Sequence, residues 1–273
     1  MAFGSNSPFG LRINESVSGG GLTDKMTPYK VYTTAAGVGP TLAGSVGYLF
    51  KGDPVVFDSA GVAGAGVTSV AAGTVEPMFT ILNAGAAATA VAQNVFVGIF
   101  MGCEYTDAIT GITKYDTFIP NALQVKSGTS ITAFVNDDPN VLFEVQYSTS
   151  TNNAEASPRS IFLNGFIGQN AKLQLGGVAF TAPVGVIPTQ NPASGNISTK
   201  TSGVYVDGSS ITLLNAGAGN ALFDIKVVDI AYNSEPITAG TTIGVDVPFI
   251  TLLCKFNRHV YGSNGTPAPF NAA

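Results

Sequence analysis

The chain has 273 residues, of which only 11% are charged, and its formal net charge is −5. Typical globular proteins are about 25% charged, and a surface this poor in charge favours self-association, so we expect partners to cover much of it. The acidic balance excludes the basic surface that binding to a phosphate backbone requires, and we expect no nucleic-acid partner.

Residues 1–28 predict an extended arm. They contain "SNS" and "SGGG" and show no sustained periodicity. They also lack a basic segment followed by an apolar one, so we expect no secretory signal. Such an arm either stays loosely ordered or lies across a neighbouring subunit, and both interpretations remain open.

From residue 29 onward, alternating apolar and polar residues predict strands joined by turns. In "VGYLFKGDPVVFDSAG", residues 46–61, Gly52 and Asp53 predict a turn between two strands. Residues 94–121 have the same pattern, with "DAITG" at 107–111 as the hairpin loop. Residues 77–103 carry no charge, but polar and small residues interrupt them, so we expect a loop leading into a strand and no membrane span.

The stretch "AFVNDDPNVLFEVQY", residues 133–147, raises the main chemical question. Adjacent Asp137 and Asp138 are candidates for a metal-ligand pair, an acid/base pair or a turn. On an extended chain their side chains diverge, and Pro139 fixes φ, which favours a turn, with metal binding as the remaining alternative. Alternation in residues 141–147 then predicts a half-buried strand.

The second half of the chain continues the strand pattern between polar segments. Residues 148–158 predict a long loop or a subdomain boundary, and residues 176–203 a long surface excursion. The strand near 221–233 changes register at Val227, which predicts a β-bulge. In the last strand, residues 249–261, Ile250, Leu252, Cys254 and Phe256 share one face, and His259 falls on the other.

These patterns predict an all-β fold: an antiparallel β-barrel or sandwich of many short strands, with an extended N-terminal arm and long loops. We expect an arm at 1–28, a β domain at 29–261 (either undivided or split into two subdomains near 148–158) and a C-terminal tail at 262–273. No internal repeat recurs at a fixed period.

The sequence assigns no catalytic, cofactor-binding or metal-binding residue. Cys103 and Cys254 belong to no metal spacing and predict buried free thiols. His259 is the only histidine, and without a nucleophile motif it predicts a structural or surface residue. The glycines at 61–66 and the "SGGG" stretch lack the context of a nucleotide loop.

Other acidic and aromatic residues are weaker candidates. Several aspartates occur in turn-like contexts: Asp107, Asp116, Asp207 and Asp246. None belongs to a calcium-loop motif, although a weak calcium site in a loop remains an alternative. Four tyrosines could serve a carbohydrate-binding face but are scattered along the chain: Tyr105, Tyr115, Tyr205 and Tyr232.

Several segments resemble tailed-bacteriophage head proteins encoded near the major capsid protein. They are "FGLR" at 9–12, "YLFKGDPVVF" at 48–57, "VGIFMGCEYTD" at 97–107, "ITAFVNDDPNVLFEVQ" at 131–146 and "LLCKFNRHVYG" at 252–262. Residues 176–203 have no counterpart. The resemblance carries no catalytic residue and no cofactor.

The resemblance implies a virion structural protein, most simply a capsid decoration (cement) protein that binds the assembled shell. Its partners would be the major capsid protein and copies of itself, on the outer capsid surface and, during assembly, in the host cytoplasm. By hypothesis, residues 1–28 and 262–273 contact neighbouring subunits, by strand addition to a sheet edge. The alternatives are a tail, neck or fibre protein, a β-sandwich receptor- or carbohydrate-binding module and, last, an enzyme such as a depolymerase.

Overall fold

In the computed structural model of the chain, every element of the described residues is a strand, so the predicted all-β class is confirmed. The described residues are 9–16, 26–31, 33–35, 40–42, 49–57, 74–77, 79–80, 89–90, 96–119, 123, 125–148, 157–158, 167–175, 195–196, 201–212, 224–231, 242–243, 251–257 and 259–261. Residues 61–66 and the "SGGG" stretch lie outside them.

The first sheet is a closed ring of five strands. Its members are β2 (Met26–Val31), β6 (Pro54–Phe57), β7 (Thr74–Pro77), β10 (Phe96–Thr106) and β13 (Thr132–Asn136). They pair in the order β10-β13-β2-β7-β6, and β6 returns to β10. Only β2 and β7 run parallel. A sixth strand, β11 (Thr113–Asp116), extends the ring from β10.

The second sheet is also a closed ring of five strands. Its members are β14 (Val141–Ser148), β16 (Asn170–Leu175), β19 (Val204–Thr212), β20 (Ile225–Ile230) and β22 (Thr251–Phe256). They pair in the order β14-β19-β16-β20-β22, and β22 returns to β14. Only β14 and β19 run parallel. In the second ring, β19 pairs with β14 only at Tyr147 and Ser148, so residues 141–144 keep an edge with which a further strand pairs.

The two rings have the same topology. When the five strands of each ring are numbered along the chain, both rings have the order 1-3-2-4-5 and close back on strand 1, with strands 1 and 3 parallel. The sequence shows no repeat at a fixed period, so the structure reveals a duplication of topology without a visible duplication of sequence.

Short two-stranded pairs complete the fold. They are β3 (Thr33–Ala35) with β4 (Pro40–Leu42), β5 (Leu49–Phe50) with β12 (Phe118–Ile119), β8 (Phe79–Thr80) with β9 (Thr89–Ala90), β15 (Ser157–Pro158) with β21 (Thr242–Ile243), and β17 (Gly195–Asn196) with β18 (Thr201–Ser202). Within the uncharged stretch 77–103, the described residues belong to strands. No helix among the described residues is long and apolar enough to span a membrane.

The chain changes from the first ring to the second at residues 137–140, between β13 and β14. The strands on either side of "NDDPN" were expected, but they belong to different rings. The polar break at 148–158 comes later, and residues 149–156 lie outside the described residues.

Apolar side chains from the strands fill two cores. One contains Phe143, Val206 and Cys254, and the other contains Phe100, Cys103 and Val135. In β22, Leu252, Cys254 and Phe256 are buried while Lys255 is exposed, which confirms the predicted alternation. A register shift between Val227 and Asp229 confirms the predicted bulge.

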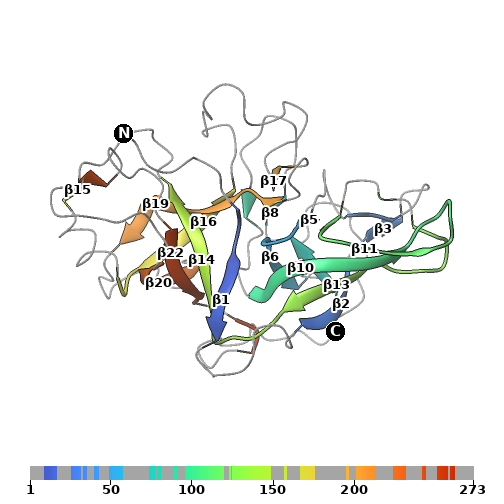
Figure 1. The fold of residues 1–273 in the computed structure, drawn as a ribbon, viewed down its shortest axis with the longest axis horizontal. Coiled ribbons are helices and arrows are strands. Elements are labelled where there is room, and N and C mark those ends of the chain that lie inside the picture. The colour runs from blue at the N-terminus through green and yellow to red at the C-terminus, as the bar shows by residue number, and fades with distance from the viewer. Residues whose placement is uncertain are drawn as a thin grey trace, which may run out of the picture.

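The expectation of a half-buried β14 is wrong, because residues 141–147 are all buried. On the polar side of this strand, Glu144 is bonded by Arg12 and Asn14 of β1 (Arg12–Ser16), which pairs antiparallel with the edge of β14 (Figure 1). Residues 9–16, expected to be part of a loose or intersubunit arm, therefore pack within their own chain in this structure.

Two segments outside the ring strands, residues 9–16 and 259–261, cross between the rings. β1 precedes the first ring in sequence but extends the second. Residues 259–261 follow the second ring but lie on the first, where the Val260 amide donates to the Phe96 carbonyl at 2.9 Å. Each ring is thus fastened by a segment from the other half of the chain.

Candidate protein-interaction site

The hairpin of β10 and β11 reaches the far end of the molecule's long axis (Figure 1). Its strands pair from Cys103 opposite Asp116 to Thr106 opposite Thr113. The loop between them includes residues 107–111, which confirms the predicted hairpin. The Asp107 amide donates to the Ile112 carbonyl at 3.0 Å and closes the loop.

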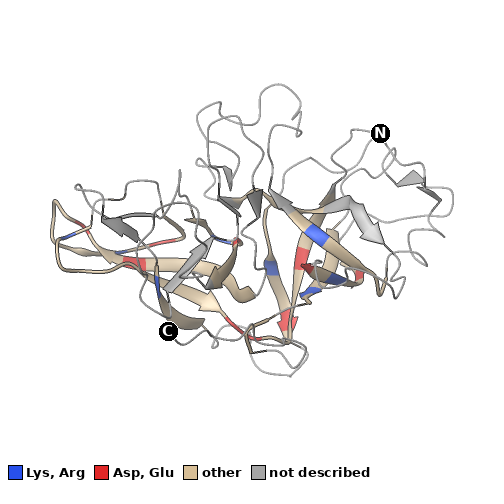
Figure 2. Ribbon diagram, turned by 180° about the vertical axis from the view of Figure 1, so that it is seen from behind, with Lys and Arg blue, Asp and Glu red and all other residues tan. Residues whose placement is uncertain are grey.

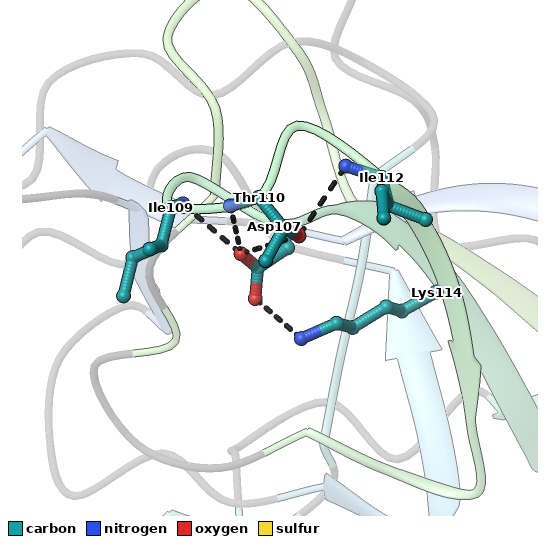
Figure 3. Close-up of polar contacts among 5 residues, drawn as sticks. All are labelled: Asp107, Ile109, Thr110, Ile112 and Lys114. Atoms are coloured by element: carbon teal, nitrogen blue, oxygen red, sulfur yellow. Dashed lines mark hydrogen bonds and ion pairs between the residues drawn. The ribbon is translucent and has the colours of Figure 1, made fainter.

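The Asp107 side chain organises this loop from within (Figure 3). Its Oδ1 accepts the Ile109 amide at 3.0 Å, the Thr110 amide at 2.8 Å and the Thr110 hydroxyl at 3.0 Å. Its Oδ2 accepts Lys114 Nζ at 2.6 Å. Lys114 first, and then the Thr110 donors, hold the pKa of Asp107 well below its usual range.

The tip of the hairpin presents apolar side chains to solvent. Ile109 is 85% exposed, Ile112 is 62% exposed and Tyr115 is 71% exposed. Residues 108–113 contain no charged side chain, and the two charges that flank them, Asp107 and Lys114, pair with each other. Elsewhere the few charged residues are scattered over the strands (Figure 2). Such a tip suits insertion into an apolar recess of another protein.

The turn residues Asp137 and Asp138 point to different partners, as their adjacency predicts. Tyr29 donates its hydroxyl hydrogen to Asp137 Oδ2 at 2.8 Å and lies 3.1 Å from the Tyr261 hydroxyl. Burial, with Tyr261 and Asp137, raises the pKa of Tyr29. Asp138 accepts the Ser16 hydroxyl at 2.7 Å and, within the turn, the Asn140 amide at 2.9 Å. Both carboxylates join the turn to neighbouring elements.

His259 is 97% buried, so its placement on a polar strand face was wrong: β22 ends at Phe256, three residues earlier. Its Nδ1 accepts the Tyr261 amide at 3.1 Å. Burial lowers the pKa of His259, while Asp137, the Val97 backbone and Asp138 act in the opposite direction. The imidazole therefore shapes residues 259–261 themselves, while the Val260 amide provides their bond to the first ring.

Asp53 lies in the interior, between β5 and β6. The Phe50 amide donates to its Oδ2 at 2.8 Å, while Oδ1 has no hydrogen-bond partner. Burial raises the pKa of Asp53 to about 7, although the Phe50 amide and the neighbouring Ser202 hydroxyl act in the opposite direction. The sequence predicted a turn here and gave no sign that the carboxylate is buried.

The remaining candidates are dispersed. Cys103 and Cys254 are buried free thiols, as expected, and burial raises the pKa of Cys254. Asp116 caps the Thr117 amide at 2.7 Å, Asp207 lies in β19, and Tyr205 is buried. Asp246 and Tyr232 lie outside the described residues. Within the described part of the chain, no three His, Cys, Asp or Glu side chains group so that they could hold a metal ion.

Comparisons with protein-family models, curated proteins and solved structures return no match. Of the features above, the hairpin tip is the one that sequence reasoning missed as a site. "DAITGIT" predicts a hairpin loop, but only the length of β10 and its position in the ring show that Ile109 and Ile112 project from the molecule.

Proposed function

We propose that this chain is a virion structural protein, a capsid decoration (cement) protein that binds the assembled shell of a tailed bacteriophage. The observation that carries the proposal is the β10–β11 hairpin, which Asp107 holds in shape and which exposes Ile109 and Ile112. The five segments that resemble phage head proteins support it, and one of them, residues 97–107, forms most of β10.

An uncharged, preformed tip is suited to protein contact because little conformational entropy is lost when it docks. A protein that binds the assembled lattice more tightly than its separated parts stabilises the lattice by mass action. Many copies in an array add avidity to a contact that is weak for each copy.

The location of the protein in the virion tests the proposal directly. A map of the particle should show hundreds of copies on the outer shell surface, in proportion to the major capsid protein. Six or twelve copies at a single vertex, or copies confined to the tail, would refute a decoration role.

Substitution of the tip tests the role of the hairpin. The variant with Ile109→Ser and Ile112→Ser should fold normally, because both side chains are exposed, but should be lost from particles. Ile167→Ser is the matched control, since Ile167 is 41% exposed and lies beside β16 in the other ring. Equal occupancy of particles by both variants, measured by quantitative mass spectrometry, would show that the tip is not the docking element.

A further inference from the structure

The strand β1 is held to the second ring by specific side-chain contacts. Leu11 is buried in a core that the second ring shares with Val56, Phe96 and Ile99 of the first ring, and its amide donates to the Gly52 carbonyl at 2.8 Å. Arg12 forms an ion pair with Glu144, and Asn14 Nδ2 donates to Glu144 Oε1 at 2.6 Å. Ser16 completes the set through its hydroxyl bond to Asp138.

On β14, the residue that accepts these bonds is Glu144. With β1 in place, Glu144 is only 4% exposed and accepts hydrogen bonds from Arg12 and Asn14. Without β1, Glu144 would lose both partners and be uncovered, and an arm of the same sequence from any copy would restore both contacts. The edge of β14 is therefore selective for a strand that places a cation and an amide two residues apart.

The arm binds the second ring, although the first ring comes directly after it in sequence. Residues 17–25 connect it to β2, and they include three consecutive glycines, Gly19, Gly20 and Gly21. A chain of nine residues spans at most about 30 Å. This length sets how far away a second β14 edge can lie and still receive the same arm.

We propose that residues 9–16 are exchanged between copies of this chain, so that the arm of one copy pairs with β14 of another. The contacts in the exchanged state are the same as in the closed state, so the contacts themselves favour neither state. The chain's own arm has the advantage of an effective concentration in the millimolar range. Exchange therefore increases as the concentration of the protein approaches that range.

This inference rests on the proposed function in one respect: a shell lattice is the setting that holds copies close together. The exchange itself is a property of the chain and can be measured without a capsid. Its partner is a second copy, and the recognition elements are Leu11, Arg12 and Asn14 on the arm and Glu144 on β14.

Cysteine pairs can report which copy supplies the arm. Glu15 and Leu142 are direct partners in the β1–β14 pairing. Single variants Glu15→Cys and Leu142→Cys are mixed at about 1 mM, near the effective concentration expected for the tethered arm, and oxidised mildly. We expect a covalent dimer that joins one chain of each kind on a non-reducing gel, with a yield that rises with concentration.

Three controls make the outcome decisive. Glu15→Cys mixed with Thr129→Cys measures random collision, because Thr129 is exposed and lies in a turn with Lys126, which bonds to the end of β10 at Thr106. The double variant Glu15→Cys and Leu142→Cys at micromolar concentration should form an internal disulfide, which confirms the pairing. The neighbouring pair, Ser16→Cys with Val141→Cys, repeats the test should Leu142→Cys fail to fold.

A dimer yield no higher than that of the Thr129→Cys control would overturn the exchange. Failure of the double variants to close internally would also overturn it, because β1 would then not pair with β14. Absence of exchange with normal occupancy of particles refutes the arm inference alone. Normal exchange in a protein that does not decorate shells refutes the proposed function alone.

Discussion

Asp53 is a carboxyl group that folding removes from water. Its pKa rises from the ordinary 3.8 to about 7, mainly because burial penalises the charged form. Between these two values the folded state binds a proton that the unfolded state has released. The contribution of Asp53 to the unfolding free energy is therefore fully present below about pH 4. It is lost as pH rises toward about 7, by about 4 kcal/mol at most.

Asp53→Asn should remove this pH dependence, because the amide keeps an oxygen for the Phe50 amide and does not ionise. Relative to the unsubstituted protein, the variant should gain about 2 to 4 kcal/mol between pH 4 and pH 8. Urea unfolding of both proteins at several pH values measures the difference. A difference in unfolding free energy that stays constant over this range would show that folding does not raise the pKa of Asp53.

At Asp137 the expectation is structural. Asp137→Ala removes the acceptor of the Tyr29 hydroxyl and should cost about 1 kcal/mol of unfolding free energy. Tyr29→Phe removes the same bond from the other side together with the Tyr261 contact, so the double variant should be little worse than Tyr29→Phe alone. Thermal unfolding of the three variants gives the coupling, and additive losses would mean that the two residues do not interact.

At the scale of single elements, local chemistry was readable from the sequence. Alternation predicted β22, "NDDPN" predicted the turn and "DAITG" predicted the hairpin, because turn residues and a period of two are local signals. The partners of Glu144 in β14 were not predictable, because Arg12 lies 132 residues earlier in the sequence. His259 was misplaced because the pattern does not show where β22 ends.

The hairpin loop should depend on the acceptor oxygens of Asp107. Asp107→Ala removes the acceptor of the Ile109 and Thr110 amides, so these amide hydrogens should lose protection from exchange. Asp107→Asn keeps an acceptor for both amides and loses only the ion pair with Lys114, so it should retain most of the protection. Hydrogen exchange followed by NMR distinguishes the two, and unchanged protection in the alanine variant would exclude Asp107 as the organiser of the loop.

At the scale of the whole molecule, the sequence predicted strands and did not predict which strands pair. An alternating strand carries no label for its partner, so two closed rings with one strand order could not be deduced. The aspartates of "NDDPN" show the same limit: a turn was predicted, and its place between two rings became visible only in the structure.

The crossed ends predict that the two rings stay together after the chain is cut. A protease site inserted after Pro139 lies between the rings. After cleavage the halves should co-elute on gel filtration, because β1 holds the first half to the second ring and residues 259–261 hold the second half to the first. Deletion of residues 1–16 in the same background should weaken the association. Separation of the intact halves would mean that the crossed contacts are too weak to hold them.

The crossing also sets the order in which the protein can be completed during synthesis. Arg12 leaves the ribosome long before Glu144 exists, since 132 residues separate them. At about 5–20 residues per second, the arm waits roughly 7 to 26 s for its own acceptor strand. Throughout that interval, a finished neighbour translated from the same message already carries the strand that the arm recognises. A nascent chain is therefore the state of this protein in which its N-terminal strand has the longest opportunity to meet another copy.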